Sequence, residues 1–528
     1  MKKTVCIFIC FCIMFCLASC RQNQDVLSSS EIGLTPTDVN TDGKKDISLL
    51  YSYSDTLDPY TATTSANRQL ALLLYDCLVK TDNNFNAHYI LAQSVETVDK
   101  ICTVKLREAV FTDGTEVTAS DIIYSYNMAK NCSRYSYNFY EVTGVSAADS
   151  KTVVFNLSQY DPFFENLLDF PIIKNGTSGV TNADGKEIAP IGCGRYFLSD
   201  DGLSLKLNTN YYGRCGVIET INLINSPDAA STSHYVEIGA THIYYAEGDN
   251  IVRMSGKRTE VNLNRLVYIG INSGCGSLQS REMRYAISSA LDREAICRSA
   301  YYNNAVSANG FFNPSFEPTK AHQTIENTPN LKITVENLSK IGYNNLNSNG
   351  FYSNSSGNNP SFTLLVNSEN SSRVAAAKLI ASQCKAAGIQ INVVECSYEQ
   401  YVTRLTNGDF QLYLGEIQLL DNMDFTNLVV AGGSAAYGVG LENSSNNDTT
   451  NEGADSNAQP QKSGCEQILS TYHQGACGIS DVAGTLLTEM PQIPVCYLNS
   501  VLFYDSSITG GATASSSDIY FSIENYEF

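Results

Sequence analysis

The feature that most constrains the fold is an alternation of strand-like and helix-like segments between residues 362 and 417. Short β-rich runs alternate with two stretches of helical composition, and each helical stretch closes on a glycine, Gly388 or Gly408. The segments are, in order, FTLLV, SSRVAAAKLIASQCKAAG with a serine as N-cap candidate, IQINVVEC, SYEQYVTRLTNG and DFQLYLG. This order predicts a parallel sheet with right-handed crossovers, in an α/β fold.

A run of carboxylates follows the last of these strands. The apolar run ends at Gly415, and Glu416, Asp421 and Asp424 come within the next nine residues. Ligands of open parallel sheets sit beyond the carboxyl ends of the strands, so this position favours a binding cleft. A solvated loop explains the same residues, and for Asp421 and Asp424 it is the simpler interpretation.

Length and charge limit the class of protein. A chain of 528 residues is too long for one ordinary core and is expected to form two or three domains. Its 43% hydrophobic and 17% charged residues are typical of a globular protein. The net charge of -20 argues against nucleic acid as a partner, because phosphate binding needs basic surfaces.

The first twenty residues, MKKTVCIFICFCIMFCLASC, read as an export signal. Lys2 and Lys3 precede an apolar run of signal-peptide length, which predicts a signal peptide over residues 1–19. LASC resembles the lipobox of bacterial lipoproteins, in which the cysteine, here Cys20, carries lipid. The alternative is an ordinary signal peptide cleaved nearby. Polar residues 21–45 then predict a flexible tether.

Twelve cysteines lie in the body of the chain, between Cys77 and Cys496. Export permits disulfides, but the spacing shows no CxxC motif and a chain of this size needs no cross-links. Free thiols are therefore expected. The pairs that would overturn this expectation are Cys193 with Cys215 and Cys465 with Cys477.

A second strong helix signal covers residues 280–297, SREMRYAISSALDREAIC. Ser280 is a cap candidate, and apolar residues recur at helical spacing. Arg281, Arg284 and Arg293 lie off this apolar stripe, which predicts an amphipathic surface helix.

Several segments together resemble the extracellular solute-binding proteins of ABC importers, in the family of oligopeptide-, dipeptide- and nickel-binding proteins (family 5). The resemblance runs in family order along nearly the whole mature chain. The segments are TLDPY (56–60), LLLYDCLVKTD (72–82), LAQSVETVD, VKLREAVFTDGTEVTASDIIYSY (104–126), IGCGRYFL (191–198), LKLNTNYYG (205–213), MRYAISSALDREAI (283–296) and MPQIPVCYLN (490–499).

The resemblance implies a two-lobe, periplasmic-binding-protein-like fold of type II, in the large cluster C form, with an extra subdomain and a central cleft between the lobes. It also implies a monomeric lipoprotein on the outer face of the cell membrane, or in the periplasm of a two-membrane cell, that delivers solute to a permease. The expected divisions are lobe I at 46–82, 186–265 and 489–528, its extra subdomain at 83–185, and lobe II at 266–488.

The chain departs from the family at its best-known ligand motif. Peptide-binding members show Gly-Trp-x-x-Asp-Tyr after the strand that corresponds to DFQLYLG, where the Trp packs on ligand and the Asp meets the peptide ammonium. Here Gly415 matches, Glu416 stands at the Trp position and Leu419 at the Asp position. Glu416 or Asp421 is a candidate for the replacement charge, because a buried ammonium needs a paired anion. A changed ligand is the alternative.

Other candidate ligand contacts follow from the same resemblance. Tyr135 and Tyr137 lie where the family places an aromatic segment that faces the cleft, and a core or surface position is the alternative for each. Arg404 lies near where some peptide binders meet a ligand carboxylate, although an exposed helix arginine is the simpler interpretation. Asn272 is expected near the hinge, and Tyr437 in the cleft.

Signs of catalysis or of a resident cofactor are weak. No two of the five histidines are three or four residues apart, and HExxH, P-loop and GxGxxG motifs are absent. GGSAA (432–436) lacks the second glycine of a nucleophile elbow. We therefore expect no cofactor and a binding protein for short peptides. The alternatives are a metal complex, haem or an oligosaccharide as ligand, a receptor for peptide signals, and, more remotely, a surface hydrolase.

Overall fold

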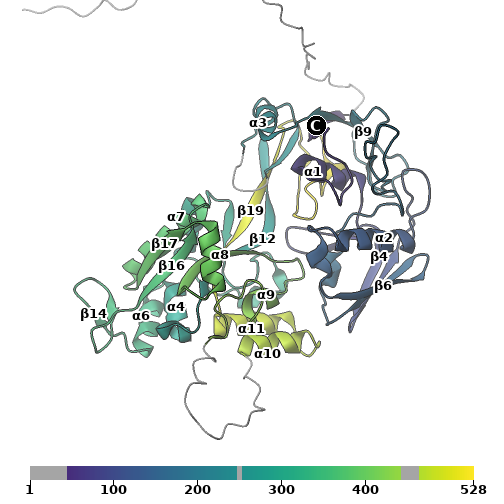
Figure 1. Ribbon diagram of the computed structural model, residues 1–528. Helices are drawn as coiled ribbons and strands as arrows, with labels where there is room; N and C mark the ends of the chain where they lie inside the picture. Colours follow the sequence, from purple (N-terminus) through teal and green to yellow (C-terminus); the bar gives the residue numbers. More distant parts are fainter. Residues whose placement is uncertain (1–44, 247–251, 442–462) are drawn as a thin grey trace, which may run out of the picture. The chain divides into compact units, whose positions relative to one another are not determined.

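The computed structural model describes residues 45–246, 252–441 and 463–528 (Figure 1). All of these belong to one compact unit, Thr41–Phe528. The predicted signal peptide, Cys20 and nearly all of the tether lie outside the described residues. Within the described ranges, no helix is long and apolar enough to cross a membrane.

A seven-stranded mixed sheet contains the segment that the sequence singled out. Its strand order is β11-β19-β12-β18-β16-β17, and β13 pairs with β19. The strands are β11 (Ile243–Ala246), β12 (Lys257–Ile271), β13 (Ala305–Ser307), β16 (Ser361–Asn367), β17 (Gln390–Cys396), β18 (Leu412–Gln418) and β19 (Ile493–Tyr504). β16 is parallel to both β17 and β18, which confirms the predicted parallel arrangement.

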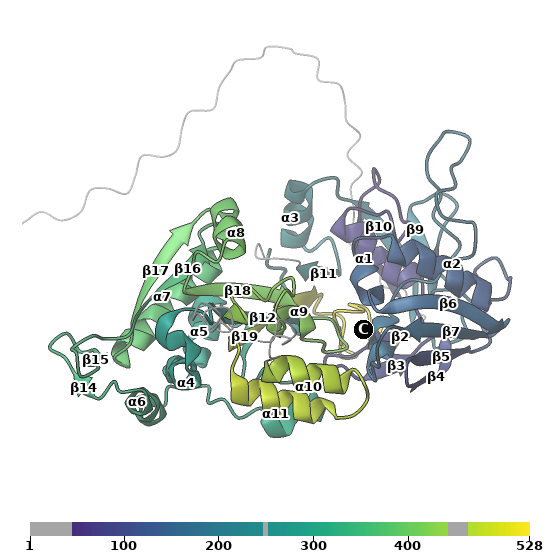
Figure 2. The same cartoon turned by 60° about the horizontal axis from the view of Figure 1, so that its bottom comes forward.

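Helices α7 (Ser371–Ala386) and α8 (Tyr398–Thr406) connect these parallel strands and lie on opposite faces of them (Figures 1 and 2). Right-handed crossovers that move outward and then back along a sheet produce this arrangement. Gly388 follows α7 with φ +82°, a left-handed conformation that glycine adopts without strain. The N-cap of α7 is Asn370 and not a serine, since its side chain accepts from the Arg373 N–H.

The helix predicted over residues 280–297 is two helices, α4 (Arg281–Ser289) and α5 (Arg293–Ala300). Ser280 caps α4 as predicted, but Asp292 caps α5 by accepting from the Ala295 N–H, so the helix restarts there. The predicted exposed arginine face is wrong for Arg284 and Arg293, which are buried. Arg293 is 0% exposed, and its Nε donates to the Pro494 carbonyl at 3.0 Å, so the backbone satisfies its donors.

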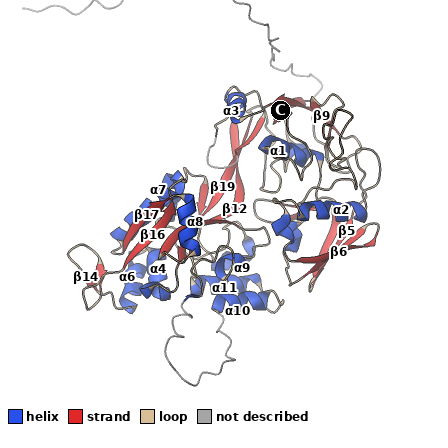
Figure 3. Cartoon of the chain, viewed as in Figure 1, coloured by secondary structure: helices blue, strands red, loops and turns tan. Residues whose placement is uncertain are grey.

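Two further sheets form the other half of the described chain (Figures 2 and 3). In one, the order is β1-β10-β9-β8, and in the other, antiparallel β4-β5-β7-β6 is packed against helix α2. Their strands are β1 (Lys45–Tyr51), β4 (Ala92–Val98), β5 (Ile101–Leu106), β6 (Val142–Asp149), β7 (Thr152–Leu157), β8 (Tyr196–Leu198), β9 (Ser204–Leu207) and β10 (Ile218–Asn225). Two small ribbons pair β2 (Val79–Thr81) with β3 (Ala87–Tyr89), and β14 (Asn345–Leu346) with β15 (Tyr352–Ser353).

The remaining helices connect and cover these sheets. The α-helices are α1 (Ser65–Leu74), α2 (Ala119–Lys130), α3 (Ala229–Glu237), α6 (Leu331–Lys340), α9 (Thr426–Val429), α10 (Gly464–Tyr472) and α11 (Ile479–Glu489). The short 3-10 helices are η1 (Ser136–Phe139), η2 (Phe164–Leu167), η3 (Gly276–Gln279), η4 (Glu317–His322) and η7 (Ile523–Asn525).

Buried apolar side chains separate into two large clusters. The first core takes residues from Ile47 to Val261 and again from Leu502 to Tyr526. The second core takes Phe85 and residues from Leu266 to Leu498. β12 and β19 therefore pass side by side from one core into the other. The domain boundaries drawn from the sequence stay predictions.

All twelve cysteines between Cys77 and Cys496 carry thiols in the structure, and each of them is buried or half-buried. The pairs nominated from the sequence, Cys193 with Cys215 and Cys465 with Cys477, are not cross-linked. Packing thus accounts for these residues, because a buried thiol behaves as a small apolar side chain.

Candidate functional site

The two cores meet at a bulge in β12. The register between β12 and β19 shifts between Asn262 and Arg265, and Asn264 adopts a left-handed φ of +49°. Asn264 is fully buried, its carbonyl accepts from the Leu419 N–H at 3.0 Å, and its Nδ2 donates to the Leu420 carbonyl at 3.1 Å. The bulge therefore anchors the chain that leaves β18, residues 419–424, which we name the junction segment.

Side chains and carbonyls of the junction segment bond to the first core. Thr81 Oγ1 donates to Asp421 Oδ2 at 2.7 Å, and Asn166 Nδ2 donates to the Asp421 carbonyl at 3.0 Å. Asn422 Nδ2 donates to Asp161 Oδ2 at 2.7 Å. Polar groups of both cores thus share one buried network, whose hydrogen bonds must break if the cores separate here.

Two carboxyl groups of this network and a third one near it, that of Asp169, lie where desolvation disfavours the ionised form. Burial raises the pKa of Asp421 to about 6 and that of Asp161 to about 6. Burial, together with the charge of Asp421, raises the pKa of Asp169 to about 7. Desolvation disfavours the charged form of an acid, so these groups attract a proton or a cation.

Asp424 differs from its neighbours because it has a cationic partner. Burial alone would raise the pKa of Asp424, but the hydrogen bond and charge of His473 outweigh it and lower that pKa. The same pair raises the pKa of His473, although burial acts in the opposite direction. His473 Nε2 lies 3.7 Å from Asp424 Oδ1, and the Tyr160 N–H of the first core donates to the His473 carbonyl at 3.0 Å.

Tyr135 and Tyr137 flank the first core's side of this junction. Asn138, the residue after Tyr137, donates from Nδ2 to Asp169 Oδ1 at 3.1 Å. Tyr135 is half-buried against Tyr60, with ring centroids 6.1 Å apart, whereas Tyr137 is 73% exposed. Four of the predicted site residues, Tyr135, Tyr137, Asp421 and Asp424, therefore belong to one region.

Glu416 lies inside β18, because the strand continues to Gln418 and does not end at Gly415 as predicted. Its Oε2 accepts from Arg373 Nε at 3.1 Å and Nη2 at 2.8 Å, and its Oε1 lies 3.7 Å from Arg265 Nη1. We name these three residues the arginine corner. Arg373 lies in the first turn of α7, and Arg265 lies in β12 directly after the bulge, so one helix and two strands meet at this carboxylate.

Gly415 faces the opposite side of the sheet from Glu416, as alternation along a strand requires. A Cβ at Gly415 would approach Tyr268 Cζ to 2.6 Å and Tyr413 Cε2 to 2.8 Å. Tyr413 OH donates to the Ala435 carbonyl at 3.1 Å, and its ring lies 6.1 Å from that of Tyr437. Gly415 therefore makes room for packed tyrosines.

Asn272 and Arg404 lie at the other edge of the sheet, near the start of β18. Asn272 Nδ2 donates to the Phe410 carbonyl at 3.0 Å, at the end of β12 far from the bulge. Arg404 Nε donates to Asp409 Oδ2 at 3.1 Å, and this pair is largely exposed. Tyr437 belongs to the same edge, since the Ser273 N–H donates to the Gly438 carbonyl at 2.9 Å.

Five residues of these two regions escaped the sequence reasoning: Asp161, Asp169, Arg265, Arg373 and His473. One of them carried a local signal. An arginine in the first turn of a helix opposes the helix dipole, so Arg373 in SSRVAAA implies a nearby anion. The others are brought together only by contacts between distant segments.

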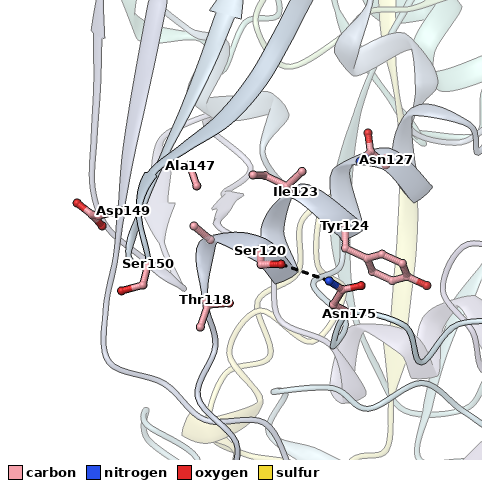
Figure 4. A pocket seen from close by; sticks show the side chains of 10 residues that line it. Thr118, Ser120, Ile123, Tyr124, Asn127, Ala147, Asp149, Ser150 and Asn175 are labelled. Atoms are coloured by element: carbon pink, nitrogen blue, oxygen red, sulfur yellow. Dashed lines mark hydrogen bonds between the residues drawn. The ribbon is translucent and has the colours of Figure 1, made fainter.

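A hollow among the described residues lies elsewhere, at helix α2 (Figure 4). It has a volume of about 660 Å³ and is lined by the first half of α2 and the turn between β6 and β7. Ser120 and Asn175 hydrogen-bond at its wall, at 3.2 Å. None of the predicted site residues lines it. In the described ranges, no group of three or more His, Cys, Asp or Glu side chains is arranged to hold a metal ion.

Known proteins share this architecture. The nickel ABC transporter protein from Bacillus halodurans superposes with a TM-score of 0.70 at 20% identity, over 92% of this chain and 100% of that one. The periplasmic murein tripeptide binding protein MppA, in an unliganded open form, gives 0.68 at 17% identity, over 88% and 94%. The fold is thus that of the type II periplasmic binding proteins, as the sequence predicted.

Comparison of the sequence with known families identifies the family, which the shared fold alone does not. The model of the bacterial extracellular solute-binding proteins, family 5, matches residues 86–436. The oligopeptide-binding protein AppA of Bacillus subtilis (strain 168) is 27% identical over 378 residues, which are 66% of this chain and 69% of AppA. The chain belongs to family 5 of the bacterial extracellular solute-binding proteins. It is a solute-binding protein of the kind that serves ABC importers, which confirms the resemblance seen in the sequence.

Proposed function

We propose that this protein captures short peptides between its two cores and delivers them unchanged to an ABC permease. The observation that carries the proposal is the junction, where polar groups of both cores meet around carboxyl groups with raised pKa values. AppA and MppA are named for peptide ligands, which supports the same ligand class.

The junction suits the ammonium end of a peptide. Asp421 and Asp169 have no cationic side chain among the described residues within ion-pair distance, unlike Asp424 with His473. A ligand ammonium is able to supply that missing charge and to form charge-assisted hydrogen bonds. Asp421 thus remains our candidate for the replacement of the family's missing aspartate, with Tyr135 and Tyr137 beside it.

Binding would act through the strands shared by the cores. Only β12 and β19 of the seven-stranded sheet contribute large buried side chains to both cores, and the bulge at Asn264 interrupts their pairing. A ligand that touches both cores shifts the population toward the closed arrangement. Backbone hydrogen bonds to an extended peptide would add affinity with little sequence preference.

Isothermal titration with a library of di- to hexapeptides tests the proposal. We expect heats that correspond to micromolar or tighter binding for at least one length class, and recovery of the peptide unaltered by mass spectrometry. No heat with any member would overturn peptide capture. A cleaved peptide would instead favour the surface hydrolase.

A metal complex is the second candidate, because a nickel transporter protein is among the structural neighbours. Elemental analysis of the purified protein separates the two candidates. Stoichiometric nickel or another metal in the purified protein, together with no heat of peptide binding, would favour the metal complex as the ligand.

We also propose lipid attachment at Cys20 and display on the outer face of the cell membrane. The support is the sequence LASC after an apolar signal. Labelling with a radioactive fatty acid should mark the wild-type chain, and Cys20→Ala should lose the label and release the protein from the membrane fraction. An unlabelled wild-type chain would contradict the proposal.

A further inference from the structure

Two buried thiols lie side by side in the second core. Helix α5, which carries Cys297, packs against β13 and against β19, which carries Cys496 (Figure 2). Ser307 of β13 lies directly opposite Cys496, and its Oγ is 3.7 Å from Cys297 Sγ. The Cys496 thiol also donates a hydrogen bond to the Cys297 sulfur. The two sulfur atoms are therefore neighbours, although the residues are far apart in the sequence.

A buried positive charge lies next to this pair. Arg293 precedes Cys297 by four residues on α5, so the two side chains share a face of the helix. The guanidinium of Arg293 donates to backbone carbonyls and to the Ser288 hydroxyl, none of which carries a charge. Burial lowers the pKa of Arg293 to about 10, so the group is still charged at pH 7. Its charge favours a thiolate beside it.

The two thiols differ in how easily they lose a proton. The hydrogen bond from Cys496 lowers the pKa of Cys297, and the charge of Arg293 acts in the same direction, against burial. Burial raises the pKa of Cys496 well above its ordinary value, and the hydrogen bond to Cys297 adds to the rise. By contrast, burial raises the pKa of the Cys384 thiol in α7 to about 12. The pair thus holds one thiol that favours the nucleophilic thiolate and a second thiol next to it, as thiol–disulfide exchange requires.

The pair also encloses most of the second core along the chain. This core takes nearly all of its residues from the stretch between Leu266 and Leu498, so a bond from Cys297 to Cys496 would close most of that stretch into one covalent loop. A cross-link restricts the unfolded chain, and the restriction grows with the length of the loop that it closes. Oxidation of the pair would therefore stabilise the second core.

We propose that Cys297 and Cys496 are a redox pair, shown here in its reduced state, that a disulfide oxidant converts into a cross-link between α5 and β19. The Cys297 thiolate attacks one sulfur of the oxidant, forms a mixed disulfide and releases the first thiolate of the oxidant. Cys496 then loses its proton and attacks Cys297 Sγ, and the second thiolate of the oxidant leaves with the electrons of the broken bond. The pair gives up two protons and two electrons in total, and the oxidant becomes two thiols. Because Cys297 is only 6% exposed, the exchange takes place during folding or local opening of the helix.

Oxidised glutathione is the probe for the test. The full chain is incubated with it, once in the folded state and once during refolding from urea. The remaining thiols are then alkylated, and the digested protein is mapped by mass spectrometry. We expect the peptides that contain Cys297 and Cys496 to be joined in at least the refolded sample, and dithiothreitol to separate them. Alkylation of both cysteines in both samples, or any other main partner for either cysteine, would overturn the proposal.

Thermal denaturation measures the consequence of the cross-link. The oxidised wild type should melt about 5 °C or more above the reduced wild type, because a long loop is closed. Cys496→Ala should abolish this difference, whereas Cys384→Ala, which removes another buried cysteine of the same core, is the matched control and should keep it. Equal melting temperatures of the two wild-type forms, or a difference that persists in Cys496→Ala, would overturn the stabilising role of this pair. The mapping by mass spectrometry uses the unmodified chain and does not depend on the folding of either variant.

Discussion

The junction segment directly follows β18 and the arginine corner lies near the end of that strand. The two regions differ in the sign of their unpaired charge. At the junction, Asp161 is buried and Asp169 and Asp421 are half-buried, and desolvation raises the pKa values of all three carboxyl groups. At the corner, one carboxylate is held by two arginines. The junction therefore lacks positive charge and the corner has an excess of it.

The largest change in stability is expected when one arginine of the corner is removed. Arg373→Gln leaves Glu416, 15% exposed, with only the longer contact to Arg265. We expect the free energy of unfolding to fall by about 2–3 kcal/mol, since removal of one partner leaves a largely buried charge unpaired. Urea denaturation at pH 7 measures it.

The double variant is the control for that result. Adding Glu416→Gln should recover much of the loss, because no charge is then stranded. If the single variant is as stable as the wild type, the ion pairs of the corner contribute little to the free energy of unfolding.

The junction should respond to pH in the direction that its raised pKa values dictate. A carboxyl group whose pKa rises on folding contributes most below its unfolded value near 4, and the contribution is lost as pH rises toward 7. The wild type should therefore lose about 1–2 kcal/mol between pH 5 and pH 8 relative to Asp169→Asn, which cannot ionise. Denaturation of both proteins at the two pH values checks this, and parallel curves would contradict it.

Replacement of His473 should change the stability by less, and over a different pH range. The pKa of Asp424 is lowered and that of His473 is raised, so their attraction is fully present between about pH 4 and 6.5. It weakens as His473 deprotonates above that range. His473→Gln should cost about 1 kcal/mol at pH 6 and less at pH 8.5, by thermal denaturation. A larger loss at pH 8.5 than at pH 6 would show that the histidine acts through packing alone.

The smallest effect is expected at the far edge of the sheet. Arg404 pairs with Asp409, whose side chain is 74% exposed. Arg404→Gln should change the free energy of unfolding by less than about 0.5 kcal/mol and leave peptide affinity as it was. A clear loss of peptide affinity in this variant would indicate that the ligand binds at this edge of the sheet.

Local patterns predicted the scaffold around both regions. Alternation of strand and helix signals in residues 362–417 was sufficient to predict the parallel strands and the position of Glu416 near their carboxyl edge, because each element is encoded over a few adjacent residues. The same patterns missed the break before α5, since the apolar stripe continues through Asp292 and only its capping role reveals the restart.

The partners of the site residues were not predictable in that way. Arg265 and Glu416 come from strands far apart in the sequence, and Asp161 meets Asn422 only because two cores touch. Charge type alone favoured an ammonium ion as the partner of Glu416. In the structure two arginines already pair with this carboxylate, and the contact with Arg265 follows from the pairing of β12 with β18.

The route of the chain through the two cores also sets an order for synthesis. The second core draws on one continuous stretch from Leu266 to Leu498 apart from Phe85, so its parts are all present before translation ends. The first core closes only with Leu502 to Tyr526, the last portion to be made. A nascent chain thus carries an unfinished N-terminal half while the later half is already able to collapse, and loss of the final two dozen or so residues would harm the part that was made first.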